Sequence, residues 1–220
     1  MLELFKIWDC GLPKCRYGNQ YDGGYVIADG LDYDYFLSCG IGGNITFEFE
    51  FIKDNPIIGK SFFDADLIRD EITKEKLRLI PDLNFYWLKI NSETNLHEYL
   101  RKYKNIFLKM DIEGGEFKWI ESLPLELLSS IRQMVIEFHD VQRSIECIEK
   151  LQLTHSLIHL HGNNYSPCIR IDNQEFPSVY EATFVRTSDF PDIKLSDKKY
   201  PCPFDSPNNP YKPEIDLSYL

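Results

Sequence analysis

Short apolar runs alternate along the chain with longer stretches whose apolar residues recur every three or four positions. The predicted strands are 35–39, 57–63, 85–90, 106–110 and 131–138, and the predicted helices are 45–53, 67–79, 96–103, 116–128 and 141–151. Pro124 is expected to kink or split the fourth of these helices. Strand–helix units that repeat in this way predict an α/β fold around a mostly parallel, doubly wound sheet.

The two ends of the chain depart from this rhythm. Residues 1–34 are typical of an irregular entry followed by a small β element, with a strand at 25–28. After about residue 156 the strands 157–161 and 180–186 have no strong helix between them, which predicts an antiparallel edge. Residues 196–220 are rich in Pro, Asn and Asp, so an extended surface tail or partial disorder is expected. We therefore predict one domain over 1–195 (with 1–34 as an N-terminal β element and cap) and a tail over 196–220.

Composition restricts the partners of the protein. The 220 residues carry a net charge of −11, and Lys and Arg are interspersed with acids, which argues against long nucleic acid as a partner. No apolar run approaches the roughly 20 residues needed to span a bilayer, and no secretion signal is seen at the start. The six cysteines are scattered, which favours reduced thiols and a cytoplasmic location.

A glycine-rich turn directly follows the first of the alternating strands. It reads Gly40-Ile41-Gly42-Gly43-Asn44, and helical spacing resumes at Ile45. Glycine lets the backbone take positive φ and approach a ligand closely, so the turn indicates either a nucleotide-type site or a plain tight turn. The second strand ends in Asp64, 24 residues after Gly40, where an acid can bind a ribose diol or cap the next helix.

Acidic residues and a histidine follow the next two long strands. Asp111-Ile112-Glu113-Gly114-Gly115-Glu116 comes after strand 106–110, and it is either a solvated helix start or a cluster that faces a ligand. Glu137-Phe138-His139-Asp140 ends strand 131–138, and a His beside carboxylates is suited to accept a proton near neutral pH. His159 and His161 alternate on a later strand, where a metal-binding pair or a structural role are both open.

These segments carry a family likeness. Leu108-Lys109-Met110-Asp111-Ile112-Glu113-Gly114-Gly115-Glu116 resembles the Lys-x-Asp-x-Glu-Gly-x-Glu signature of FkbM-type S-adenosylmethionine-dependent methyltransferases. The segments 22–25 and 38–48 resemble the entry and glycine motif of methyltransferases of that superfamily, so the likeness runs from about residue 16 to 140.

The resemblance implies a Rossmann-like class I methyltransferase fold and O-methylation of a sugar or other small hydroxylated acceptor. It implies S-adenosylmethionine as cofactor, bound by Gly40, Ile41, Gly42, Gly43, Asn44, Glu48, Asp64 and Asp111. The expected catalytic residues are His139 as the base, Asp111 and Glu137. Asp111, Glu137 and Asp140 offer oxygen ligands that would suit Mg²⁺, which lowers the pKa of a bound hydroxyl.

Two other functions stay open. An NAD-dependent oxidoreductase or sugar-modifying enzyme with a Rossmann fold would need a fuller glycine fingerprint and a Tyr-x-x-x-Lys or similar pair, which we do not find. A non-catalytic binding protein with the same fold would differ only in leaving the methyl group on the cofactor.

Overall fold

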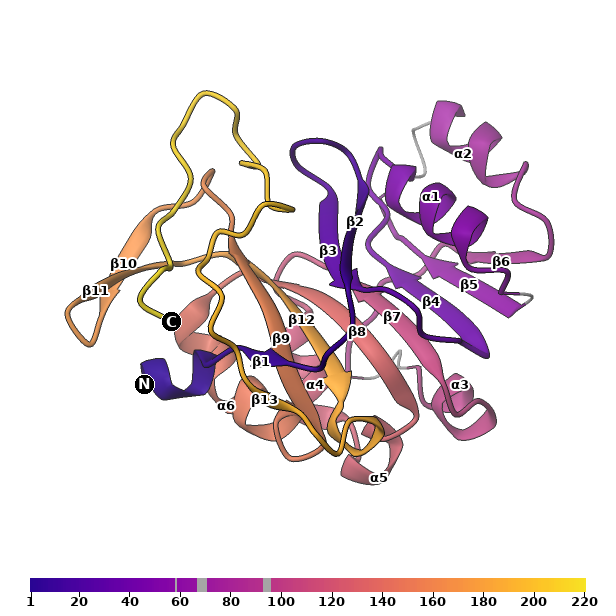
Figure 1. The fold of residues 1–220 in the computed structure, drawn as a ribbon. Coiled ribbons are helices and arrows are strands. Elements are labelled where there is room, and N and C mark those ends of the chain that lie inside the picture. The colour runs from indigo at the N-terminus through magenta and orange to yellow at the C-terminus, as the bar shows by residue number, and fades with distance from the viewer. Residues whose placement is uncertain (58, 67–70, 93–95) are drawn as a thin grey trace.

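A seven-stranded sheet lies at the centre of the computed structural model, which describes residues 1–57, 59–66, 71–92 and 96–220 (Figure 1). In spatial order its strands are β6 (Leu83–Tyr86), β5 (Gly59–Phe63), β4 (Tyr35–Cys39), β7 (Ile106–Met110), β8 (Ile131–Phe138), β12 (Tyr180–Arg186) and β9 (His155–Gly162). The first five strands run parallel, and β12 is antiparallel to both of its neighbours. The predicted α/β class, with a mostly parallel sheet and an antiparallel C-terminal edge, is confirmed.

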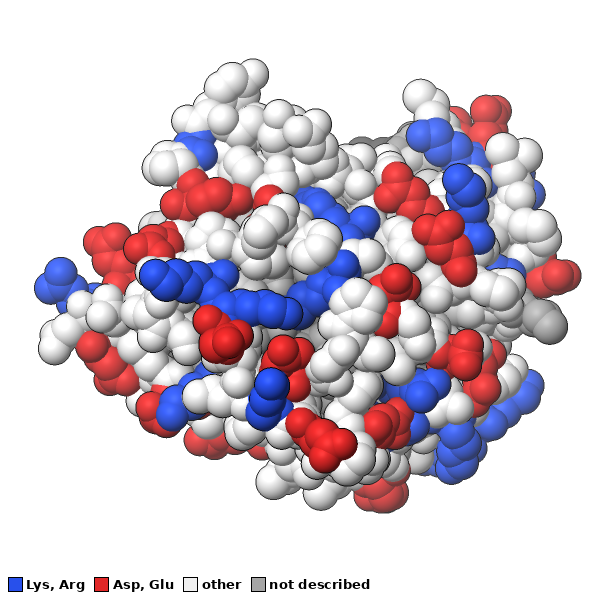
Figure 2. Space-filling view, viewed as in Figure 1, with Lys and Arg blue, Asp and Glu red and all other residues white. Residues whose placement is uncertain are grey.

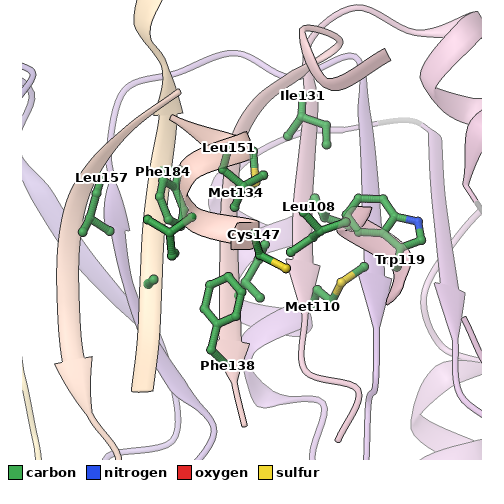
Figure 3. Packing of buried hydrophobic residues seen from close by; sticks show 14 of the residues in the cluster. Leu108, Met110, Trp119, Ile131, Met134, Phe138, Cys147, Leu151, Leu157 and Phe184 are labelled. Atoms are coloured by element: carbon green, nitrogen blue, oxygen red, sulfur yellow. The ribbon is translucent and has the colours of Figure 1, made fainter. Parts of the chain in front are cut away.

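Helices cover both faces of this sheet. They are α1 (Thr46–Asp54), α2 (Glu71–Leu77), α3 (His97–Lys102), α4 (Glu116–Ser122), α5 (Leu125–Leu128) and α6 (Val141–Leu151). Alternation along β7 shows how the layers divide: Leu108 and Met110 belong to the apolar cluster of α3, α4 and α6, whereas Phe107 belongs to the cluster of α1. Figure 3 shows the first cluster, in which Trp119 and Cys147 lie near these strand residues.

The predicted element boundaries hold best where strands are buried. β7, β8, β12 and α6 have the expected bounds, and the chain is split at Pro124 into α4 and α5. The strand expected at 85–90 is instead β6 (Leu83–Tyr86), because its only partner in the sheet, β5, ends opposite Tyr86 at Phe63. Residues 58 and 67–70, included in the strand expected at 57–63 and the helix expected at 67–79, lie outside the described ranges.

Three small antiparallel pairs surround the main sheet. β3 (Gly24–Ala28), expected from the sequence, pairs with the unexpected β2 (Lys14–Gly18), and this hairpin packs beside α1. β10 (Cys168–Ile171) pairs with β11 (Gln174–Pro177), and β1 (Trp8–Asp9) pairs with β13 (Lys194–Leu195). The β2–β3 hairpin brings the N-terminal region to the carboxyl ends of β4 and β7, where the candidate site lies.

The C-terminal tail packs against the body of the protein. Tyr200, Asn208 and Leu217 are buried, and the Asn208 amide donates a hydrogen bond of 2.9 Å to Glu181 on β12. Of the two interpretations of residues 196–220, packing on the surface is therefore the observed one. The division of the chain into one domain and a tail stays a prediction.

Candidate functional site

The site lies where the strand order reverses. From β4 the chain builds β5 and β6 on one side and then places β7 on the other, so the ends of β4 and β7 open at a topological switch point. Ligands of doubly wound sheets bind at this position, outside the carboxyl ends of the strands. The glycine turn follows β4, and the acidic turn beginning at Asp111 follows β7.

Gly40 is required by the packing of these two turns against each other. Its φ is +76°, and a Cβ added there would lie 1.5 Å from the main-chain oxygen of Asp111. The Asp111 N–H donates to the Cys39 carbonyl at 2.9 Å, and the Gly40 N–H donates to the Phe63 carbonyl at 2.9 Å. The first glycine thus fixes the position of Asp111.

Asp64 holds the same glycine turn from the end of β5. Its Oδ2 accepts hydrogen bonds from the N–H groups of Ile41 at 2.8 Å and Gly42 at 2.9 Å, and its Oδ1 accepts from Asp66 at 2.7 Å. The N–H groups of Ile41 and Gly42 are thus already bound by this neighbouring carboxylate, and their contact with a cofactor stays a prediction. Asp64 remains in the wall of a cleft, and its ribose contact stays a prediction.

The remaining residues of the expected cofactor set lie around the start of α1. The Asn44 side chain accepts a hydrogen bond from the Thr46 N–H at 3.0 Å, and Asn44 and Gly43 line a cleft. Glu48 is fully buried, and burial raises its pKa. Its Oε1 accepts from Ser38 at 2.6 Å and lies 3.8 Å from the Lys109 ammonium, whereas its Oε2 is buried without a hydrogen-bond partner.

Asp111, Glu137 and His139 come together at the ends of β7 and β8. One potential ligand atom from each lies within 4.8 Å of the others. The His139 Nε2 is 3.6 Å from Asp111 Oδ1 and 3.4 Å from Glu113 Oε2. All three predicted catalytic residues are therefore brought to one place, although their catalytic roles stay predictions.

A hydrogen bond orients each member of this cluster, and of the three partners only Glu116 belongs to a motif that the sequence indicated as a possible part of the site. The Tyr25 hydroxyl donates to Asp111 Oδ2 at 3.0 Å, and the Asn163 amide donates to Glu137 Oε1 at 2.7 Å. The His139 ring contacts the fully buried Glu116 through Nδ1, at 3.2 Å. Glu116 therefore fixes the orientation of the imidazole.

The charge around His139 changes its protonation. Burial lowers its pKa, but the hydrogen bond to Glu116 and the carboxylates of Glu137 and Asp111 outweigh burial and raise the pKa to about 9. For Glu137, burial first, and then the charges of Asp111 and Glu181, hold the pKa well above its usual range. At neutral pH the imidazole is therefore protonated, so the prediction of a base that works near neutrality requires something to remove this proton.

Asp140 does not belong to the cluster. Its Oδ1 accepts hydrogen bonds from the N–H groups of Gln142 at 2.9 Å and Arg143 at 3.2 Å, which makes it the N-cap of α6. Asp140 is thus absent from the group whose ligand atoms lie close enough to share an ion, which consists of Asp111, Glu137 and His139.

His159 and His161 serve the packing of the tail. His159 Nε2 lies 2.8 Å from Asp205, and His161 lies between Glu181 and Glu214 at 3.3 and 3.1 Å. Both rings are buried, and the structural interpretation of this pair is the one that its contacts favour.

Two clefts meet at Asp111. The first, about 290 Å³, is lined by the glycine turn, the end of β5 with Asp64, and residues 88–90. The second, about 400 Å³, is lined by Tyr25, Glu137, His139, Asn163 and Tyr165 together with the start of α1. Ile41, Gly42, Asp111 and Glu113 line both clefts. Two ligands bound there would face each other across Asp111.

No family model and no curated protein matches this chain, so membership in the FkbM-type family is not shown. Among solved structures, an rRNA methylase from Streptococcus thermophilus is 14% identical with a TM-score of 0.42, over 71% of this chain and 89% of that one. A precorrin-6y C5,15-methyltransferase from Geobacter metallireducens is 10% identical with a TM-score of 0.43, over 71% and 82%. A 23S rRNA methyltransferase is 10% identical with a TM-score of 0.45, over 71% and 63%. Identities and TM-scores this low carry no argument about the activity of this protein.

Within the described residues, no helix has the length and apolar character that crossing a membrane requires. Most of the face shown in Figure 2 is uncharged, a run of basic side chains crosses its middle, and acidic side chains lie along the lower side of that run.

Proposed function

We propose that this protein is an S-adenosylmethionine-dependent methyltransferase that acts on a hydroxyl group of a carbohydrate or other small acceptor. The observation that carries the proposal is the pair of clefts that meet at Asp111, at the switch point of the sheet. The likeness of residues 108–116 to the FkbM-type signature supports it, because this segment builds the junction of the clefts.

The cofactor is assigned to the smaller cleft. Gly42 lines this cleft with φ +58°, and a Cβ added there would meet nothing within 4 Å, so the turn leaves open space for a ligand. Asp64 and Asp111 line this cleft, which supports them as the acids that would accept hydrogen bonds from its hydroxyl and amino groups. The methyl group would then point toward the larger cleft, past Asp111.

The acceptor is assigned to the larger cleft. Its lining carries five carboxyl groups, from Asp22, Glu48, Asp111, Glu113 and Glu137, against the basic side chains of Lys109 and His139. A hydroxylated acceptor can donate hydrogen bonds to these carboxyl oxygens and accept them from the basic groups, and the excess of acidic over basic side chains disfavours a phosphate-rich one. The half-exposed ring of Tyr165 and the amide of Asn163 lie in the same wall.

Catalysis in this arrangement depends largely on position. The acceptor oxygen must lie in line with the bond between the methyl carbon and the sulfonium, and the two clefts would supply this alignment. Asp111, Glu137 and His139 are the groups against which the reacting hydroxyl would be placed.

The assignment of the cofactor is tested by calorimetry with S-adenosylmethionine and, separately, NAD. We expect S-adenosylmethionine to bind and NAD not to bind. In Gly42→Val the side chain enters the open space of the cleft, so affinity should fall at least tenfold while the protein stays folded. Unchanged affinity in folded Gly42→Val would contradict the placement, and preferential binding of NAD would contradict the proposed function.

A further inference from the structure

The Asp111–Glu137–His139 cluster has the dimensions of a cation site. The 3.6 Å between His139 Nε2 and Asp111 Oδ1 is too long for a hydrogen bond. Two ligands that each lie about 2.1 Å from one ion, at the angles of tetrahedral or octahedral coordination, are about 3 to 3.5 Å apart. The Glu137 carboxylate lies within 4.8 Å of both atoms. The observed spacing is close to that of two ligands on one ion, and a small movement of the side chains would bring all three onto it.

Each of the three side chains is also held through an atom that an ion would not need. Tyr25 binds Asp111 Oδ2, Asn163 binds Glu137 Oε1, and Glu116 contacts His139 Nδ1. None of these three contacts uses Asp111 Oδ1, Glu137 Oε2 or His139 Nε2. A carboxylate that accepts the second ring N–H of a His is the usual support of a metal-ligating imidazole, because it fixes the tautomer and makes the other nitrogen more basic.

One residue that lines the same cleft has a buried polar atom with no hydrogen-bond partner. Oε2 of the fully buried Glu48 makes no hydrogen bond, although Glu48 lines the cleft together with Asp111, Glu137 and His139. Buried polar atoms are nearly always paired in native proteins, either with protein groups or with bound water and ions. This atom is a second, independent sign that the cleft holds a polar ligand or a hydrated ion.

We propose that Asp111, Glu137 and His139 bind one divalent cation of the Mn²⁺ type. Two carboxylates and one imidazole favour such an ion over Mg²⁺, which prefers oxygen ligands alone. The site follows from the geometry of the cluster, and only its role in catalysis rests on the proposed function. The ion takes the lone pair of Nε2 and displaces the proton that the surrounding carboxylates otherwise hold there.

The bound cation allows the cluster to activate the acceptor hydroxyl at neutral pH. A hydroxyl bound to the ion loses its proton to solvent more readily, since the positive charge stabilises the oxyanion. The oxygen then forms a bond to the methyl carbon, and the carbon–sulfur bond breaks with its electron pair returning to sulfur. The products are a methyl ether and neutral S-adenosylhomocysteine. His139 is a ligand in this account and not the proton acceptor.

The test is a titration of metal-free protein with Mn²⁺, read from the loss of the electron paramagnetic resonance signal of the free ion. We expect one ion per chain, and Mg²⁺ should displace it only at much higher concentration. Glu137→Gln should weaken binding at least tenfold. Glu116→Gln should weaken it about 10- to 100-fold without removing a ligand, as loss of a group that orients a ligating His does. Circular dichroism verifies that the variants are folded.

Asp140→Asn is the matched control. It removes a carboxylate adjacent in sequence to the cluster but keeps the N-cap, so Mn²⁺ affinity should not change. Absence of stoichiometric binding below millimolar Mn²⁺, or equal affinity in wild type and Glu137→Gln, overturns the proposal. Methyl transfer that survives chelation refutes the catalytic role of the ion and leaves the methyltransferase assignment intact. Site-specific Mn²⁺ binding by a protein that does not bind S-adenosylmethionine would refute the assignment and leave the metal site.

Discussion

The contrast between Gly40 and Gly42 gives a quantitative test of how the glycine turn builds the site. Both residues have positive φ, +76° and +58°, so alanine at either position costs roughly 1–2 kcal/mol from the left-handed backbone alone. At Gly42 this is the whole cost, because its Cβ would meet nothing within 4 Å.

At Gly40 the same substitution must also displace backbone. The added Cβ would lie 1.5 Å from the Asp111 main-chain oxygen, and contacts under 3.0 Å are essentially never observed for real Cβ atoms. Hydrogen bonds to Cys39 and Phe63 hold the backbone on both sides of this contact. We therefore expect Gly40→Ala to cost about 4 kcal/mol or more, which is a large part of a typical total stability of about 5–15 kcal/mol.

Urea unfolding measures both variants, with the fluorescence of the tryptophans, including the fully buried Trp119, as the signal. The midpoint should fall slightly for Gly42→Ala and strongly for Gly40→Ala, and cofactor binding should be lost in Gly40→Ala even where it is folded. Equal midpoints for the two variants would refute the close packing of the two turns.

Three further predictions follow from single residues or from the charge of the cleft. Asp140→Ala removes the N-cap of α6 and should lower the free energy of unfolding by about 1 kcal/mol, with methyl transfer retained. Loss of methyl transfer in the folded variant would show that Asp140 takes part in the active site. In metal-free protein the pKa of His139, measured by NMR, should be near 9. Because the folded pKa is raised, the stability that His139 contributes is present below its ordinary pKa of 6.5 and is lost as pH rises through about 9, so the difference in unfolding free energy between wild type and His139→Gln should shrink over that range. A midpoint at or below 6.5 would contradict the effect of the surrounding carboxylates on this ring. Structured RNA and duplex DNA should not bind at physiological salt, and salt-sensitive sub-micromolar binding in a filter assay would contradict a small neutral acceptor.

The sequence predicts the sheet well because local pattern and tertiary environment agree there. β7 and most of β8 are buried, and apolar residues make up most of both strands although Lys109, Arg132, Gln133 and Glu137 interrupt them, so the runs were visible in the sequence. β6 is an edge strand that ends where its partner β5 ends. The residues of β6 contain no information about the end of β5, so this boundary could not be predicted from them. β2 likewise depends on pairing with β3, and its polar residues carry no strand signal by themselves.

The sequence predicted those residues of the candidate site that stand at or directly after the end of a strand. Asp111, Glu137 and His139 meet because parallel strands end at one edge of the sheet. Tyr25 and Asn163 could not be found, since they reach the site from segments 86 and 26 residues distant from their partners. The role of Asp140 was readable in principle, because an Asp directly before a helix is a favoured N-cap.

The measurement that tests the central claim most directly is transfer of a labelled methyl group from S-adenosylmethionine to a panel of sugars, nucleotide sugars and other small hydroxylated molecules. Wild-type protein supplied with Mn²⁺ should label at least one neutral acceptor, and Asp111→Asn should reduce the rate at least tenfold, the scale expected when a positioned catalytic group is lost. Label that remains on the cofactor with every acceptor, or equal transfer by wild type and Asp111→Asn, would contradict the account.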